Sequence, residues 1–224
     1  MDAPALPQGA LKPRAKDAYE ASIAVVKLGG SIVRAKTLEN WLDVIAGAAA
    51  PIVVVPGGGA LADEVRTCQR DLGFGDAPAH RMALLAMDQL AWAVAGLRPG
   101  FEVGETEAAL RDILARGHVA VWAPHAAISG RTDLEANWRL TSDSLALWLS
   151  GQLGARACYI VKSVASKRGA ASAAALSRDG VVDEAFPAML AETGIPAVMF
   201  GQGDQDALAE MLADSTARAG RAIE

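Results

Sequence analysis

Short apolar runs alternate along the chain with longer segments whose apolar residues recur at helical spacing. Buried strands are predicted at residues 23–28, 51–56, 118–123, 157–161 and 196–200, with an edge strand at 221–223. Helices are predicted at residues 38–48, 61–72, 79–97, 105–115, 142–153, 183–191 and 204–213. This alternation predicts the α/β class, a three-layer αβα sandwich with helices on both faces of a mainly parallel central sheet.

Two segments lie outside this pattern. Residues 1–21 mix prolines with charges and lack the continuous apolar stretch of a signal peptide, so they are predicted to be a flexible tail before a single domain at 22–224. Residues 166–175 (SKRGAASAAA) are small, polar and basic, which predicts a mobile surface loop. No stretch reaches the roughly twenty apolar residues that a membrane-spanning helix needs.

Composition narrows the function classes. Of 224 residues, 52% are hydrophobic and 21% charged, and the formal net charge of -5 argues against a nucleic-acid partner. The two cysteines, Cys68 and Cys158, lack the close spacing of a metal knuckle or redox pair. They are expected to be buried thiols in a reducing cytoplasm.

Two glycines directly follow the first predicted strand, within residues 26–31 (VKLGGS). Gly29 and Gly30 let the backbone turn sharply and let an anion approach the main-chain N–H groups. Lys27 can offer an ammonium to a phosphate held over this turn, and Ser31 adds a hydroxyl. We expect Lys27 to face the surface and contribute little to packing. The glycines alone would equally suit a tight connection, and the string matches neither a GxxxxGK[ST] loop nor a GxGxxG fingerprint.

Three more glycines, Gly57, Gly58 and Gly59, follow the second predicted strand and lead into a helix. The free N–H groups at a helix start and the positive end of its dipole favour a bound anion. In a parallel sheet both glycine turns open at the carboxyl edge, where ligands of such sheets bind. The two turns together predict a phosphate site between them.

Residues 140–144 (LTSDS) place hydroxyl side chains and Asp143 at the start of a predicted helix. An ordinary helix N-cap is one interpretation, because Ser, Thr and Asp are favoured there for local reasons. Beside the glycine turns, Asp143 is also a carboxylate able to position cations such as Lys27 around a transferring phosphoryl group. Such positioning supplies most of the catalysis in phosphoryl transfer.

These three strings, in this order and spacing, resemble the amino-acid-kinase superfamily over residues 22–223. The resemblance implies that superfamily's fold, with an acceptor-binding half at about 22–135 and a nucleotide-binding half at about 136–224. It also implies ATP with Mg²⁺ as the phosphoryl donor, a small-molecule acceptor and a homo-oligomer. By this resemblance Lys27, Gly29, Gly30, Ser31 and Ser142 contact ATP phosphates, Gly57 to Gly59 hold the acceptor, and Asp143 organises the lysines.

A narrower resemblance is carried by residues 79–83 (AHRMA) with 86–88 (AMD), by 138–145 (WRLTSDSL) and by 182–187 (VDEAFP). They look like the branch that phosphorylates an aminomethylfuran-methyl phosphate during assembly of methanofuran or methylofuran. The implied reaction makes a diphosphate from a phosphate monoester and ATP, so the acceptor is itself an anion.

Several side chains are candidates for contacts to this acceptor. His80 could donate to its phosphate, or it could be a solvated histidine at a helix start. Asp63 and Asp88 could hold its amine, or they could be solvated helical carboxylates. Trp138 and Trp148 could line a pocket for the furan ring, although aromatics around a buried helix more often belong to the core.

One segment departs from the superfamily pattern. Members commonly continue the strand after the aspartate helix into Val-Asp-Gly, which shapes the nucleotide site, whereas residues 161–167 here read VKSVASK. Lys162 is expected to supply a second cation for the phosphates. No histidine has a carboxylate or cysteine partner at ligand spacing, so no histidine-based metal site is predicted.

Other functions stay open at this point. A carboxylate kinase would form an acyl phosphate, and activity with glutamate, aspartate or an acetylated amino acid alone would select it. A molybdate or tungstate storage protein has the same fold, and many bound metal atoms per chain would favour it. A catalytically silent regulatory partner is the third alternative.

Overall fold

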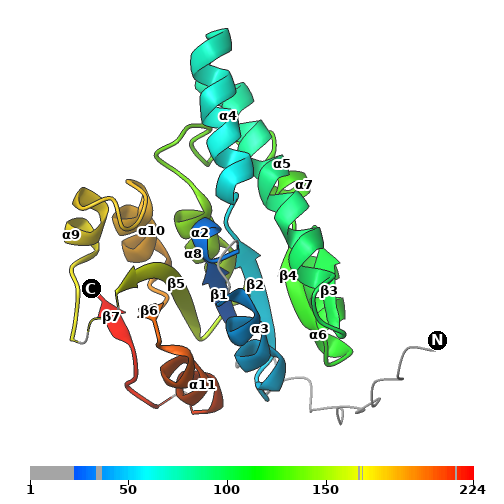
Figure 1. The fold of residues 1–224 in the computed structure, drawn as a ribbon, viewed down its shortest axis with the longest axis vertical. Helices are drawn as coiled ribbons and strands as arrows, with labels where there is room; N and C mark the ends of the chain where they lie inside the picture. Colours follow the sequence, from blue (N-terminus) through cyan, green and yellow to red (C-terminus); the bar gives the residue numbers. More distant parts are fainter. Residues whose placement is uncertain (1–22, 34–36, 166, 168, 215) are drawn as a thin grey trace.

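A computed structural model describes residues 23–33, 37–165, 167, 169–214 and 216–224. They form a seven-stranded sheet in the order β3-β4-β2-β1-β5-β6-β7 (Figure 1). Its strands are β1 (Ala24–Leu28), β2 (Ile52–Pro56), β3 (Phe101–Gly104), β4 (Val119–Trp122), β5 (Ala157–Ala165), β6 (Ala197–Gln202) and β7 (Arg221–Ile223). Among these strands only the β6–β7 pair is antiparallel, which confirms a mainly parallel sheet.

Helices cover both faces of the sheet and confirm the three-layer αβα arrangement (Figure 1). They are α2 (Gly30–Val33), α3 (Leu38–Gly47), α4 (Gly59–Leu72), α5 (Asp76–Ala95), α6 (Glu107–Ala115), α7 (His125–Ile128), α8 (Ser142–Leu153), α9 (Ala173–Arg178), α10 (Phe186–Thr193) and α11 (Gln205–Ala213).

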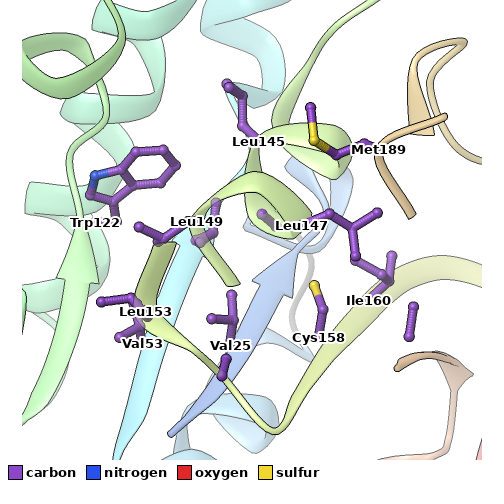
Figure 2. Packing of buried hydrophobic residues seen from close by; sticks show 14 of the residues in the cluster. Val25, Val53, Trp122, Leu145, Leu147, Leu149, Leu153, Cys158, Ile160 and Met189 are labelled. Atoms are coloured by element: carbon purple, nitrogen blue, oxygen red, sulfur yellow. The ribbon is translucent and has the colours of Figure 1, made fainter. Parts of the chain in front are cut away.

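Alternating strand residues divide the interior into two cores. Val25 and Val53 point to one face, where they join residues of α6, α8 and α10. Figure 2 shows Leu149 and Leu153 of α8 lying beside these two valines. The intervening strand residues, such as Val26, point to the other face and pack with α3 and α11. Because each fully buried aliphatic side chain contributes about 1.5–3 kcal/mol, both layers are held firmly against the strands.

The helix pair α4 and α5 projects beyond the carboxyl ends of β1 and β2 (Figure 1). Val65 is the buried hydrophobic residue of α4, so most of that helix is exposed. In the middle of α5, Leu84 and Met87 join the core that contains α8, whereas Ala91 and Val94 near its end join the core that contains α3. The projecting pair therefore forms one wall of the space above the carboxyl edge of the sheet.

The structure corrects the predictions in a few places. Residues 101–104 form the edge strand β3, which was not predicted because it is only four residues long and carries Glu102. The helix predicted to begin at residue 79 begins instead at Asp76, because Pro78 is tolerated in the first turn of α5, where a missing N–H costs little. In the predicted loop 166–175, residues 166 and 168 lie outside the described residues, Ala171 pairs with Ile223, and Ala173 begins α9.

Three further expectations concern the predicted tail, membrane-spanning helices and the two cysteines. The predicted tail at 1–21 lies outside the described residues. None of the helices in the described ranges combines the length and apolarity needed to cross a bilayer. Both cysteines are free; Cys158 is buried, as expected, and burial raises the pKa of its thiol to about 12, whereas Cys68 is only half-buried.

Candidate active site

Two lysines project from neighbouring strands toward the start of α8. Side chains alternate along a strand, so Lys27 lies on the same face as Val25, which packs in the core with α8. By the same alternation Lys162 follows Cys158 and Ile160 of β5 onto that face. β1 and β5 are paired in parallel, with Leu28 opposite Val161, so both lysines arrive at the same carboxyl edge.

Asp143, in the first turn of α8, lies between the two lysines. Its Oδ1 is 2.5 Å from the Lys27 Nζ, and its Oδ2 is 2.5 Å from the Lys162 Nζ. Asp143 and Lys27 are only 4% and 2% exposed, so the expectation that Lys27 faces the surface was wrong. Lys27 can be buried because Asp143 is buried beside it. An unpaired charge in the interior would be costly.

The ion pairs and burial act together on the pKa values. Burial is the largest effect on Lys27 and lowers its pKa from 10.5 to about 8, although the charge of Asp143 acts in the opposite direction. Burial alone would raise the pKa of Asp143, but the charges of Lys27 and Lys162 together hold it at about 2. At neutral pH Asp143 is therefore ionised, and Lys27 is protonated but close enough to its pKa to respond to nearby charge.

The two glycine turns touch each other directly. A Cβ added to Gly30 would lie 2.5 Å from the backbone nitrogen of Gly59, and one added to Gly57 would lie 2.7 Å from that of Gly30. Gly59 has a φ of +52°, a left-handed conformation that favours glycine. Side chains at these positions would force the turns apart, so the glycines serve close approach as well as sharp turning.

A cavity of about 240 Å³ opens over the turns and the ion pairs. Its polar lining includes Lys27, Gly30, Ser31, Ser142, Asp143 and Lys162 at one end and Gly57, Gly58, Gly59, Asp63, Arg66 and His80 toward α4 and α5. Apolar side chains complete it: Ala62, Ala83, Leu84, Met87, Trp138, Leu140 and Leu145. Eleven residues were predicted from the sequence to bind ATP phosphates or the acceptor, and the lining includes nine of them.

Two of the candidates lie elsewhere. Gly29 is not among the lining residues, and its N–H donates to the Val161 carbonyl at 2.9 Å, so it ties β1 to β5. Asp88 does not line the cavity either. Its carboxylate accepts a hydrogen bond from the His125 N–H at 3.1 Å at the start of α7. The structure therefore gives Asp88 a structural partner in place of a predicted substrate amine.

His80 and Asp63 both line the cavity, but His80 is buried whereas Asp63 is exposed. His80 is 9% exposed, so it is not the solvated histidine of the alternative interpretation. Burial lowers its pKa, which leaves the imidazole neutral at pH 7, and a hydrogen bond to the backbone of Asn137 opposes that shift. Asp63 is well exposed and pairs with Arg66 at 3.1 Å.

Arg66 and Trp138 form a contact that the sequence did not reveal. The Arg66 guanidinium carbon lies 4.0 Å from the centre of the Trp138 ring, and the indole N–H donates to Gln69 at 2.6 Å. This contact joins α4 to the segment preceding α8 at the cavity rim. Trp148 instead stacks on Trp122, with ring centres 6.1 Å apart, and it does not line the cavity.

The side chains present determine how a metal ion could be held. Within the described ranges, no group of three or more His, Cys, Asp or Glu side chains has the geometry for a metal site. Asp143 is already engaged by two lysines. Both carboxylate oxygens of Asp143 are therefore occupied by ammonium groups.

Comparison with known proteins agrees with this geometry. The model of the amino acid kinase family matches residues 22–166, and the chain belongs to that family. It is 27% identical over 146 residues to (5-(aminomethyl)furan-3-yl)methyl phosphate kinase of Methanocaldococcus jannaschii. That match covers 62% of this chain and 65% of the relative, so it spans a little less than two thirds of the relative's length.

Solved structures show the same fold. Uridylate kinase from Archaeoglobus fulgidus superimposes with a TM-score of 0.66 at 17% identity, covering 90% of this chain and 99% of that one. UMP kinase from Bacillus anthracis also gives 0.66, at 14% identity and with 91% and 96% coverage. UMP kinase from Ureaplasma parvum gives 0.63 at 12% identity, with 91% and 98% coverage. These likenesses confirm the predicted amino-acid-kinase fold.

Proposed function

We propose that this protein is an ATP-dependent phosphotransferase that converts a small phosphate monoester to its diphosphate. The observation that carries the proposal is the Lys27–Asp143–Lys162 ion-pair group beside two touching glycine turns. An oxygen of the acceptor phosphate attacks the γ-phosphorus of ATP, a new P–O bond forms, and the bond to the bridging oxygen breaks to release ADP. Positioned cations suit this step because its transition state spreads negative charge over oxygens.

Each part of the cavity has a role in this proposal. Lys27 and Lys162, positioned by Asp143, neutralise charge on the transferring phosphoryl group, and Ser31 and Ser142 donate to ATP phosphates. Gly57, Gly58 and Gly59 bring backbone to the acceptor phosphate without steric obstruction. Mg²⁺, carried by the nucleotide phosphates, would supply further charge neutralisation there. In this proposal, Asp143 of the nucleotide half (about 136–224) contacts Lys27 of the acceptor half (about 22–135).

The acceptor end suits a flat, partly apolar group attached to the phosphate. Leu84, Met87 and Trp138 offer apolar surface close to the glycine turn, while His80 and Arg66 offer polar contacts. Asp63 is the remaining carboxylate of the cavity lining besides Asp143, and it can pair with an amine. These features, with the M. jannaschii relative, support (5-(aminomethyl)furan-3-yl)methyl phosphate as the acceptor, and hence a role in assembling a furan-containing cofactor.

The test is an ADP-release assay with Mg-ATP and separate acceptors. The panel contains the aminomethylfuran-methyl phosphate, UMP, isopentenyl phosphate, glutamate, aspartate and acetylglutamate. Turnover with a phosphate monoester supports the proposal, and preference for the furan compound supports the specific acceptor. Turnover with carboxylates alone would select a carboxylate kinase. ATP binding without turnover of any phosphate acceptor would overturn the proposal, and molybdenum or tungsten in the purified protein would then favour storage.

The Asp143→Asn variant gives that assay its internal control. It removes the charge that holds both lysines while keeping the size of the side chain, so turnover is expected to fall by about 100-fold or more. Asp112→Asn, on the exposed side of α6, changes the same atoms away from the cavity and should leave turnover unchanged. Equal activity of both variants would contradict the assigned site.

We also propose that the chain self-associates through the outer face of α5. Met82, Leu85 and Trp92 are exposed apolar residues on this helix, at spacings that place them along one side. Sedimentation velocity should show a concentration-dependent oligomer that Trp92→Asp dissociates. Leu72→Asp, an equally apolar-to-acid change at the end of α4, is the matched control. Dissociation by the control alone would place the interface elsewhere.

A further inference from the structure

Asp183 anchors the start of α8 from a distant part of the chain. It lies forty residues after Asp143, in the connection between α9 and α10. Its Oδ2 accepts hydrogen bonds from the Thr141 N–H at 3.0 Å, the Thr141 hydroxyl at 2.8 Å and the Ser144 N–H at 3.1 Å. Its Oδ1 accepts a fourth from the Ser144 hydroxyl. Both carboxylate oxygens are thus used on residues that flank Asp143.

This contact replaces the usual local cap of a helix. Thr141 is the N-cap residue of α8, yet its side chain does not cap the helix and donates to Asp183 instead. A local Ser or Thr cap would satisfy one amide of the first turn. Asp183 engages two amides and two hydroxyls, so it restrains both the rotation of that turn and its movement along the axis.

The Asp183 segment is itself held in place. The Ala185 N–H donates to the Arg139 carbonyl at 2.9 Å, and the Phe186 N–H donates to the Asp183 carbonyl at 3.2 Å. Phe186 is fully buried at the start of α10. A rigid support of this kind can transmit its position to α8, whereas a mobile one could not.

The position of this turn matters because Asp143 must satisfy two lysines at once. Its oxygens each meet one ammonium at 2.5 Å, from two different strands. A displacement of about 1 Å would lengthen at least one contact and misplace a cation at the phosphoryl group. Holding Asp183 next to Asp143 is unfavourable in itself, because burial and the charge of Asp143 raise the pKa of Asp183. The hydrogen bonds from Ser144 and Thr141 act in the opposite direction and reduce that cost.

We propose that Asp183 is a positioning residue for phosphoryl transfer, which fixes the first turn of α8 so that Asp143 holds Lys27 and Lys162 together. The inference rests on the proposed kinase function. It predicts that losing Asp183 lowers the rate of transfer and not merely the stability of the fold.

The experiment compares Asp183→Ala and Asp183→Asn with Thr106→Ala. Thr106 caps α6 by accepting a hydrogen bond from the Ala109 N–H at 3.2 Å, so its variant loses a helix cap away from the cavity. Asp183→Ala should lower kcat by about 10- to 100-fold, with a smaller change in the acceptor KM. Asp183→Asn keeps an oxygen acceptor for the two amides and should recover part of the loss. Thr106→Ala should shift the unfolding midpoint without changing kcat.

Each outcome separates this inference from the proposed function. If the wild type is active and Asp183→Ala is no slower than Thr106→Ala, the positioning role is overturned and the kinase proposal stays intact. A wild type inactive on every acceptor would overturn the kinase proposal. The same three variants would then be compared by calorimetry with Mg-ADP. A roughly tenfold or greater loss of affinity confined to the Asp183 variants would support the positioning role, and equal affinities would overturn it.

Discussion

Gly30 and Gly59 come from turns after different strands, and their backbones are in contact. The nearest atom to a Cβ on Gly30 would be the Gly59 nitrogen, at 2.5 Å, and the Gly59 Cα would follow at 2.6 Å. No rearrangement of a flexible side chain can relieve such a contact, because both obstacles are main-chain atoms. The two proposed phosphate-binding turns are therefore close together only because both lack side chains.

Gly30→Ala is expected to separate the turns. The added methyl group should destabilise the fold by about 1–3 kcal/mol, as overpacking does in other cores, and it should reduce ADP release strongly. Chemical denaturation and the ADP-release assay measure the two effects. Gly47→Ala is the control, since a Cβ there meets nothing within 4 Å. It should be neutral or stabilise by up to about 1 kcal/mol. Similar activity of the two variants would show that the turns need not touch.

Lys27→Met should affect both turnover and stability. It removes the ammonium while keeping most of the length of the side chain, so kcat is expected to fall by about 100-fold or more. Because Lys27 is buried, its loss also leaves Asp143 with one cation in the interior, which should cost up to about 3 kcal/mol. Arg178→Met removes an exposed cation of α9 outside the cavity lining and is the control for both measurements. Unaltered turnover of Lys27→Met with a stable fold would contradict the role given to this lysine.

Most of the fold could be predicted from the sequence because the patterns that indicate its strands, helices and turns are local. The continuous apolar runs of β1 and β2, and the glycines that follow them, are visible in a few consecutive residues, whereas the order of the strands in the sheet was not predicted. The depth of Lys27 was not predictable in this way. It depends on Asp143, more than a hundred residues later, which makes burial of the ammonium tolerable.

The parts of the site that sequence reasoning missed are contacts between distant segments. Asp183 was noticed within a string of resemblance, but nothing nearby indicates that it reaches Thr141 and Ser144. Arg66 contacts Trp138, which lies 72 positions later in the chain. Such pairs follow from how helices pack on a sheet, which a single sequence does not specify. The hydrogen bond between Asp88 and the His125 N–H could not be predicted for the same reason.

Arg66→Gln should weaken the binding of the acceptor more than the binding of ATP. The guanidinium lines the acceptor end of the cavity, and a charge-assisted hydrogen bond to an anion contributes about 1.5–3 kcal/mol. The acceptor KM is therefore expected to rise about 10- to 100-fold, with little change in the KM for ATP. Arg70→Gln, one turn further along α4, tests the same change outside the cavity lining and should behave as wild type. Equal effects on both substrates would place Arg66 outside the acceptor site.

Acid should destabilise the protein through Asp143. Its folded pKa of about 2 lies below the ordinary 3.8, so its contribution to stability is complete above pH 3.8 and is lost as pH falls toward 2. The size of this contribution is roughly 2 kcal/mol, from the factor of 1.36 kcal/mol per pKa unit. Urea unfolding between pH 2 and 6 measures it, and Asp143→Asn should reduce the dependence. An unchanged slope in that variant would assign acid unfolding to other carboxylates.

At alkaline pH activity and stability should move in opposite directions. Lys27 has a folded pKa of about 8, below the ordinary 10.5, so the unfolded chain holds more protons between these values and the contribution of Lys27 to stability rises with pH. Over the same interval the free protein loses the ammonium that meets phosphate, so kcat/KM for ATP should decline above about pH 8. Pre-steady-state and steady-state rates from pH 6 to 10, with unfolding measured in parallel, test both directions. Any residual activity of Lys27→Met should lack this alkaline decline, because the group that titrates is gone. If the decline persists in the variant, the group that titrates belongs to the substrate or to another residue. Lys27 would then have to remain protonated throughout the range.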